Sequence, residues 1–216
     1  YVMSDAYLLS LARLAEVVGD YSVRTEHLGV LWNNTSVTTI ELPACGDYRR
    51  ILLDFGDLYV GNLNWTVWAN EGTILDIYCF ENMYRGDIDF TIGLNNGMRY
   101  ICRDGWQSYS AMTRIGVRYA LISVRNAVGP VKLREFSIDH TTYSSSNLGS
   151  FQCNDEQMNH IWKMCRQSHE LCTEDTFTDS PTYEQAFWLG DAQTSAIVNA
   201  LMFGDYDVIR RCLVLA

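Results

Sequence analysis

The spacing of apolar residues changes near residue 150, and this change constrains the fold more than any other feature of the sequence. Before it, short runs rich in Val, Ile, Tyr and Trp are separated by Gly and Asn, a pattern typical of antiparallel strands joined by turns. After it, apolar residues recur at spacings of three and four, as in amphipathic helices. The sequence therefore predicts a β domain followed by a helical domain. The clearest predicted strands are 51–55, 63–68, 74–78, 98–102, 117–124 and 131–138.

The same patterns give the expected domain boundaries. Residues 38–140 are predicted to form an antiparallel β-sandwich, because many short strands with regular turns favour two packed sheets. Residues 141–150 are polar and lack a period, so we interpret them as a linker. Residues 1–37 are interpreted as the tail of a preceding domain or an N-terminal segment, in which 7–15 is either a helix or part of that tail. Residues 151–216 are assigned to helices.

Three helices are predicted after the linker. The first has Asn154 as its N-cap and Gln157 at the capping-box position. The second covers residues 192–203, with Gly204 just past its end as the C′ residue. The third begins after Asp205. The apolar stripe of the first helix comprises Met158, Ile161, Trp162, Cys165, His169 and Cys172.

The composition limits the classes of ligand. A net charge of −10 without a basic cluster opposes nucleic-acid binding, and no apolar stretch approaches the roughly 18 residues needed to span a bilayer. A neutral carbohydrate is compatible with this charge. The 6 Trp and 13 Tyr residues offer the flat apolar faces that sugar rings contact. Sandwich cores use the same residue types, so composition permits sugar binding without requiring it.

The cysteines and histidines give no indication of a metal site. The seven cysteines are odd in number and contain no CxxC pair, so we expect buried free thiols in a reducing, cytoplasmic compartment. A leader outside the sequence would instead indicate a secreted or periplasmic protein. The four histidines are scattered along the chain, and neither a metal nor another cofactor is predicted. The sequence is compatible with a homo-oligomer as well as with a monomer.

The candidate site lies between the first two predicted helices. If residues 184–191 are helical, Glu184, Trp188 and Asp191 stand at i, i+4 and i+7 and share one face. Pro181 disfavours helix at the residue before it, so Asp179 would project from the preceding loop. Three carboxylates and an indole are therefore expected to lie close together.

This combination of residues suits acid-catalysed cleavage of a glycosidic bond. A Glu packed against an apolar ring and near other negative charges is harder to ionise, so Glu184 is the candidate general acid. Two-carboxylate chemistry is the usual means of glycoside hydrolysis. Trp188 is expected to pack on the sugar ring, and Asp179 and Asp191 to accept hydrogen bonds from its hydroxyls. An ordinary helix start with a core Trp remains the alternative.

These residues carry a resemblance to a known family. Asp179-Ser180-Pro181, then Glu184, then Trp188-Leu189-Gly190-Asp191 resembles the catalytic motif of glycoside hydrolase family 78, the bacterial-type α-L-rhamnosidases. That motif typically reads Asp-Cys-Pro, then a Glu, then Gly-Trp-x-Gly-Asp. Residues 53–63 with 71–73 resemble the β-sandwich that precedes the family's catalytic barrel, and residues 151–162 resemble the barrel's first helix.

The resemblance covers about residues 50–216 and implies hydrolysis with inversion, releasing terminal L-rhamnose from glycans or glycosides. It makes Glu184 the general acid and Asp179, Trp188 and Asp191 the rhamnose-binding residues, and it implies no metal. An (α/α)6 barrel has about twelve helices, so the three predicted here imply an incomplete barrel. The family's general base, a Glu further along the barrel, is expected outside this sequence.

The sequence also departs from the family pattern. Ser180 stands where Cys is usual, and the residues around Glu184 lack the common Arg, which affects sugar preference more than reaction class. Two other functions therefore stay open. One is a non-catalytic carbohydrate-binding module that uses Trp65, Trp68 and Trp106, and the other is an (α/α)6 glycosidase acting on another sugar.

Overall fold

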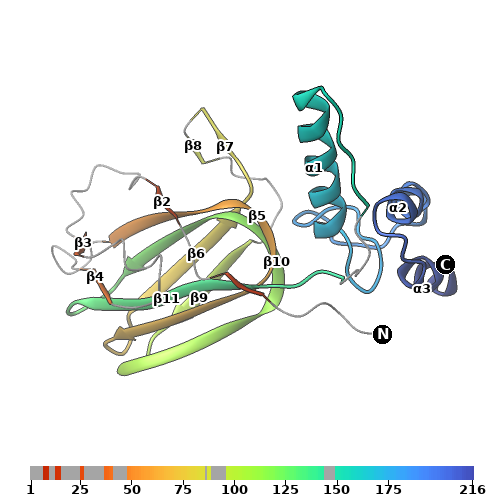
Figure 1. Cartoon of the computed structure of the whole chain (residues 1–216). Helices are drawn as coiled ribbons and strands as arrows, with labels where there is room; N and C mark the ends of the chain where they lie inside the picture. Colours follow the sequence, from red (N-terminus) through yellow and green to blue (C-terminus); the bar gives the residue numbers. More distant parts are fainter. Residues whose placement is uncertain are drawn as a thin grey trace. The chain divides into compact units, whose positions relative to one another are not determined.

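The computed structural model describes residues 7–9, 13–15, 25–26, 37–40, 48–85, 87–88, 96–143 and 149–216. These residues divide into two compact units (Figure 1). Residues 7–140 form the sheet unit, and residues 141–216 form the helical unit. In the described ranges, no helix has the length and apolar character that a membrane span requires.

The sheet unit is built around two long antiparallel strands, β5 (Tyr48–Ala69) and β10 (Gly105–Arg125). The order of the main sheet is β3-β4-β11-β5-β10-β6-β9, with β1 paired to β11 and β2 paired to β5. Two further strands form a separate hairpin (Figure 1). The remaining strands are β1 (Tyr7–Leu9), β2 (Arg13–Ala15), β3 (Thr25–Glu26), β4 (Thr38–Ile40), β6 (Ile74–Phe80), β7 (Met83–Tyr84), β8 (Asp87–Ile88), β9 (Gly97–Ile101) and β11 (Val131–His140).

Both ends of β5 contribute to one hydrophobic core. Residues 65–69 alternate as predicted, because Trp65, Val67 and Ala69 are buried while Thr66 and Trp68 are only half-buried; Asn64, predicted on the polar face, is buried. Apolar residues from the start of β5, such as Leu53, belong to the same core cluster. Figure 1 shows β5 and β10 curving along the sheet, which brings its two halves around this shared core. The predicted antiparallel β class is confirmed, and the predicted strands 51–55 and 63–68 are parts of one strand.

For residues 7–15 the sequence left a helix and the tail of a preceding domain open. Residues 7–9 and 13–15 are strands, not a helix, and they pair with residues 138–140 of β11 and 52–54 of β5. Strand β3 likewise pairs with β4, so the described parts of 1–37 belong to the sheet unit. The rest of that segment lies outside the described residues.

The expected linker differs as well. The Tyr143 N–H donates to the Thr173 carbonyl, and the Gly149 N–H donates to the Met202 carbonyl at 2.5 Å. The described ends of 141–150 are therefore attached to the helical unit. Residues 144–148 lie outside the described residues.

Within residues 149–216, which the structure describes throughout, three helices form as predicted: α1 (Glu156–Leu171), α2 (Leu189–Met202) and α3 (Asp207–Leu215). Helix α2 begins three residues before the expected start. Gly204 adopts a φ of +61° and its N–H donates to the Asn199 carbonyl, which confirms its C′ role. The stripe predicted for α1 is buried only near the C-terminal end, since Met158, Ile161 and Cys165 are exposed whereas His169 is buried.

The cysteines described are free thiols, but they are not all buried as expected. Cys165 is exposed and Cys153 is half-buried, whereas Cys79, Cys102 and Cys212 are buried. Burial raises the pKa of the Cys79 thiol to about 12, so this thiol is unreactive at neutral pH. Cys45 lies outside the described residues.

The N-cap of α1 is Asp155, one residue after the predicted Asn154. Its Oδ1 accepts hydrogen bonds from the N–H groups of Gln157 and Met158, at 2.9 and 3.4 Å. Asp155→Ala is expected to lower the free energy of unfolding by about 1 kcal/mol, measured by urea denaturation. Asn154→Ala is the matched control and should change it by less than about 0.5 kcal/mol. Equal losses in the two variants would contradict this assignment.

Candidate active site

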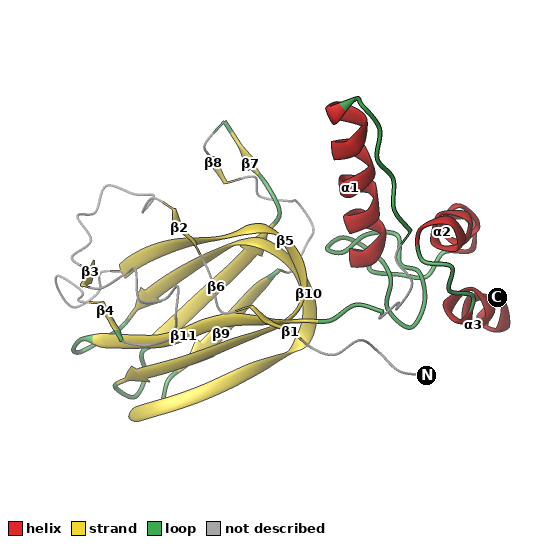
Figure 2. Cartoon of the chain, viewed as in Figure 1, coloured by secondary structure: helices red, strands yellow, loops and turns green. Residues whose placement is uncertain are grey.

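The predicted site residues lie on and just after a loop between α1 and α2, shown in green between the two helices in Figure 2. Residues 184–188 are not helical, so the predicted helix over 184–191 was wrong for all but its last residues. The cause is local. The Asp179 N–H donates to the Ala186 carbonyl, and the Ala186 N–H donates to Asp179 Oδ1 at 2.8 Å. These paired bonds close residues 179–186 into a loop, in which Gln185 adopts a φ of +51°.

Asp179 is the residue that holds this loop together. Besides the Ala186 N–H on Oδ1, its Oδ2 accepts a hydrogen bond from the Ser180 hydroxyl at 2.8 Å. Burial acts to raise the pKa of Asp179, but these bonds and those from nearby backbone N–H groups outweigh it and hold the pKa below its usual range. Asp179 is therefore an ionised acceptor at neutral pH. Ser180, which differs from the family's usual Cys, takes part in fixing its orientation.

Glu184 and Trp188 are brought together by the loop, not by a helical repeat. The Trp188 indole Nε1–H donates to Glu184 Oε2 at 2.7 Å. Both side chains are exposed, so the apolar packing expected around Glu184 is not present in this structure. The indole instead offers its polar edge to the carboxylate, which fixes one oxygen and leaves Oε1 outside this bond.

Asp179 and Asp191 line one pocket in the helical unit. The pocket has a volume of about 480 Å3 and includes residues of α1, the loop and the first turns of α2. Asp191 stands in the first turn of α2, where the positive end of the helix dipole stabilises its charge. Glu184 and Trp188 are not among the residues that line this pocket. The structure thus joins the four predicted residues as two pairs: Asp179 with Asp191, and Glu184 with Trp188.

His169 also lines this pocket, and the sequence did not assign it a role there. It is buried, its imidazole ring packs against Phe177 and Phe203, and its Nε2 lies 3.1 Å from Asn199 Oδ1. Burial is the main cause that lowers the pKa of His169, and the hydrogen bond to Asn199 and the charge of Glu170 oppose it only in part. The only signal in the sequence was its place on the apolar stripe of α1.

Neutral His169 makes stability depend on pH. Because its folded pKa lies below the unfolded value of about 6.5, its contribution is present above pH 6.5 and is lost as pH falls through the folded pKa. The melting temperature of the wild type is therefore expected to drop on acidification from pH 7 to pH 5 more steeply than that of His169→Gln. If the melting temperatures of the wild type and His169→Gln fall by the same amount between pH 7 and pH 5, His169 is not a buried, neutral imidazole.

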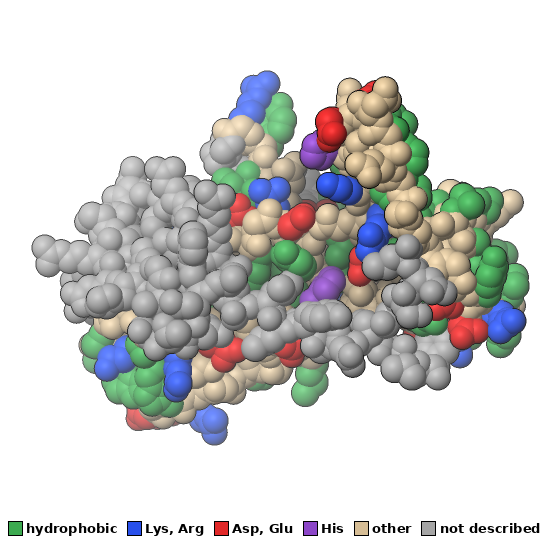
Figure 3. All heavy atoms as spheres, in the orientation of Figure 1, with side chains coloured by type: hydrophobic (Ala, Val, Ile, Leu, Met, Phe, Trp, Pro, Cys, Tyr) green, Lys and Arg blue, Asp and Glu red, His purple; other side chains and the backbone are tan. Residues whose placement is uncertain are grey.

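One of the three tryptophans considered for carbohydrate binding on the sheet unit is buried. Trp65 is 2% exposed and cannot contact a glycan, whereas Trp106 is 50% exposed and lies directly opposite Trp68. Among the described residues, no three His, Cys, Asp or Glu side chains cluster as metal ligands do. On the face shown in Figure 3, acidic and basic side chains are interspersed.

Comparisons with known proteins bear on this geometry. Residues 146–216 match a sequence model described as the bacterial α-L-rhamnosidase six-hairpin glycosidase domain. A family 78 rhamnosidase of Bacillus sp. GL1 is 41% identical over 82% of the chain, with a TM-score of 0.77. A rhamnosidase from Klebsiella oxytoca with rhamnose bound shares the fold at 19% identity over 99% of the chain, with a TM-score of 0.78. A comparison with curated proteins gave no match.

The shared region is a limited part of these relatives. The chain spans 19% of the Bacillus protein and 44% of the Klebsiella protein. An α-L-rhamnosidase from Dictyoglomus thermophilum shares the fold at 24% identity and a TM-score of 0.65, over 80% of this chain and 20% of its own. With the family's domain model matched over the helical unit and a family 78 enzyme 41% identical across both units, the chain belongs to glycoside hydrolase family 78.

Proposed function

We propose that the protein is an inverting α-L-rhamnosidase that releases terminal L-rhamnose from glycans or glycosides, and that Glu184 is its general acid. The observation that carries this proposal is the Glu184 carboxylate, held at 2.7 Å by the Trp188 indole in the loop between α1 and α2. That loop lies within the segment matching the family's catalytic domain. It also supplies Asp179 to a pocket large enough for a sugar ring.

In this proposal Glu184 acts in its protonated form. Its proton passes to the glycosidic oxygen as the bond from that oxygen to the anomeric carbon breaks, and the leaving group departs as a neutral alcohol. A water molecule attacks the opposite face of the anomeric carbon and gives its proton to a second carboxylate. We expect that base outside this sequence, as the family resemblance implies. Because Trp188 engages Oε2, the remaining Oε1 is the oxygen positioned to carry the proton.

Asp179, Asp191 and Trp188 are proposed to bind the rhamnose. Each oxygen of Asp179 already accepts one hydrogen bond, and a carboxylate oxygen has a second lone pair for a sugar hydroxyl. Asp191 presents its carboxylate to the same pocket from α2. The exposed face of the Trp188 indole offers an apolar surface to the methyl-bearing ring.

The helical unit is proposed to be the first part of an (α/α)6 barrel. Helices α1 and α2 contact one another, as do α2 and α3, which is the arrangement of successive barrel hairpins. Several apolar side chains of α3, such as Leu213 and Val214, are exposed at 70% and 80%. Such surfaces are usually covered by neighbouring helices.

The stereochemistry of the product tests the proposal. The full-length protein is incubated with p-nitrophenyl α-L-rhamnopyranoside, and proton NMR follows the anomer that forms before mutarotation. Inversion predicts that β-L-rhamnose appears first and α-L-rhamnose follows slowly. First appearance of the α-anomer would overturn the inverting mechanism. Folded protein without turnover on this substrate, but active on another aryl glycoside, would instead favour a family member with a different sugar.

A further inference from the structure

A second pocket lies on the outer face of the sheet unit. It has a volume of about 340 Å3 and is lined by residues of β6, β9 and β10. In the strand register, Ser123 lies opposite Asp76, and Asp76 lies opposite Arg99. Directly opposite residues point to the same side of a sheet. Because their neighbour Ile77 is buried in the core, this row of side chains points away from the core.

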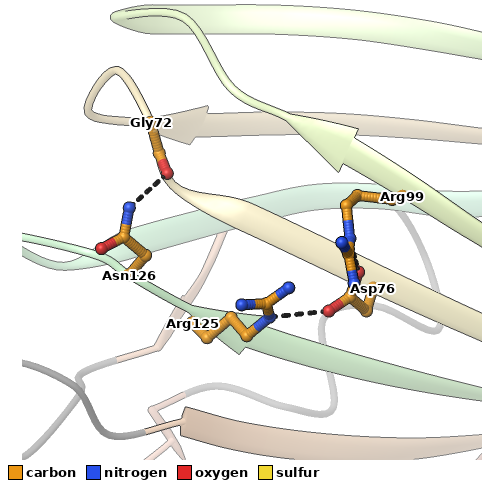
Figure 4. Close-up of polar contacts among 5 residues, drawn as sticks. All are labelled: Gly72, Asp76, Arg99, Arg125 and Asn126. Carbon is orange, nitrogen blue, oxygen red and sulfur yellow. Dashed lines mark hydrogen bonds and ion pairs between the residues drawn. The ribbon is translucent and has the colours of Figure 1, made fainter.

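Arg99 and Asp76 form the polar wall of the pocket, and Arg125, which is outside the lining, pairs with the same aspartate. Arg99 Nε lies 2.6 Å from Asp76 Oδ1, and Arg125 Nε lies 2.7 Å from Asp76 Oδ2 (Figure 4). Both contacts use Nε. The terminal nitrogens of the two guanidiniums therefore take no part in these two contacts. Two arginines against one aspartate leave a local charge of +1, on a chain whose net charge is −10.

The floor of the pocket is apolar and has a notch. Tyr78 lines it, and its ring stacks on Phe80 with centroids 5.7 Å apart, which restrains the ring. Gly97 lies directly opposite Tyr78, so the space that a side chain would fill beside the ring is open. A Cβ added at Gly97 would meet nothing closer than the Ile77 carbonyl, at 4.0 Å.

A restrained aromatic ring and the Arg99 guanidinium in one pocket define the chemistry of the ligand. Ring faces contact the C–H groups of a pyranose, guanidiniums pair with carboxylates, and Ser123 adds a hydroxyl that accepts and donates. We propose that this pocket binds a hexuronate residue of an acidic glycan, with its carboxylate on Arg99 and its ring in the notch beside Tyr78. The site is separate from Glu184 and does not depend on the proposed hydrolysis.

Calorimetric titration of the full chain with tri-D-galacturonate, beside neutral maltotriose, tests this site. The trigalacturonate is expected to bind with an affinity that falls as salt is added, and maltotriose is expected not to bind. Arg99→Gln should weaken binding about tenfold or more, because a charge-assisted hydrogen bond is lost. Arg134→Gln is the matched control: it removes the same charge from an exposed position on β11 and should change the affinity less than about twofold.

A second variant tests the contribution of the notch to binding independently of the charge of Arg99. Gly97→Val fills the space beside Tyr78 without changing the net charge, and it should weaken trigalacturonate binding about tenfold or more. Unchanged melting curves would show that each variant is folded. The proposal is overturned if the wild type does not bind trigalacturonate. It is equally overturned if maltotriose binds as tightly, or if Arg134→Gln weakens binding as much as Arg99→Gln.

Discussion

Replacing Glu184 by Gln in the full-length protein is expected to lower kcat for p-nitrophenyl α-L-rhamnopyranoside by about 10²- to 10⁴-fold, the range for loss of a general acid. Gln has the shape of Glu and keeps a carbonyl oxygen that accepts the Trp188 indole N–H. The loop therefore remains intact while the transferable proton is lost. Initial rates at saturating substrate measure the effect.

Glu156→Gln is the matched control for this change. Glu156 is also exposed and lies in the first turn of α1, outside the loop. It should leave kcat within about twofold of the wild-type value, since surface changes of this kind have small effects. A kcat for Glu184→Gln that matches the control would remove Glu184 from the chemistry.

Gly61→Ala is expected to destabilise the sheet unit by about 3 kcal/mol or more. A Cβ built at Gly61 would lie 1.8 Å from the carbonyl oxygen of Asp139 on β11 and 2.7 Å from its carbonyl carbon. Both are backbone atoms, and Gly61 lies opposite His140 in the β5–β11 register. The clash can be relieved only by moving the two strands apart. Urea denaturation gives the change in the free energy of unfolding.

Gly56→Ala separates the clash from backbone strain. Gly56 has a φ of +87°, but no atom lies within 4 Å of the position of an added Cβ. Its cost should be about 1 kcal/mol, that of placing an L-residue in the left-handed region. Equal destabilisation by the two alanines would show that β5 and β11 are not as close at Gly61 as the structure places them.

The fold class was predictable from the sequence because hydrophobic period is a local property. The alternation around Trp65 and the helical spacing after residue 150 each indicate one element type, and both were correct. The continuity of β5 was not predictable. Gly56 and Asp57 are turn-forming residues in the local sequence, and they lie in an irregularity of β5, where Gly56 has a φ of +87° and the register with β10 shifts between Asp54 and Tyr59. Pairing with β10 continues on both sides, so the turn signal marks a bulge within one strand and not the end of a strand.

The candidate site was predicted in position but not in conformation. The sequence predicted that Glu184 lies beside Trp188 because residues four apart share one face of a helix. The two side chains are indeed in contact, but in a loop closed by Asp179 and Ala186. The hydrogen bond that the Asp179 carboxylate accepts from the Ala186 N–H competes with helix formation, and no periodicity reveals such a bond. The place of His169 on the apolar stripe indicated its burial, but its contact with Asn199, 30 residues away, was not visible in the sequence.

The role of Glu184 as proton donor is tested most directly by how the loss of activity in Glu184→Gln depends on the leaving group of the substrate. Glu184→Gln and wild-type full-length protein are compared on 2,4-dinitrophenyl and methyl α-L-rhamnopyranosides. A dinitrophenolate departs without a proton, whereas methoxide needs one, so the account predicts a small loss of kcat/KM on the first substrate and a loss of about 10²-fold or more on the second. Equal losses on both substrates would contradict it and assign Glu184 to binding instead of proton transfer.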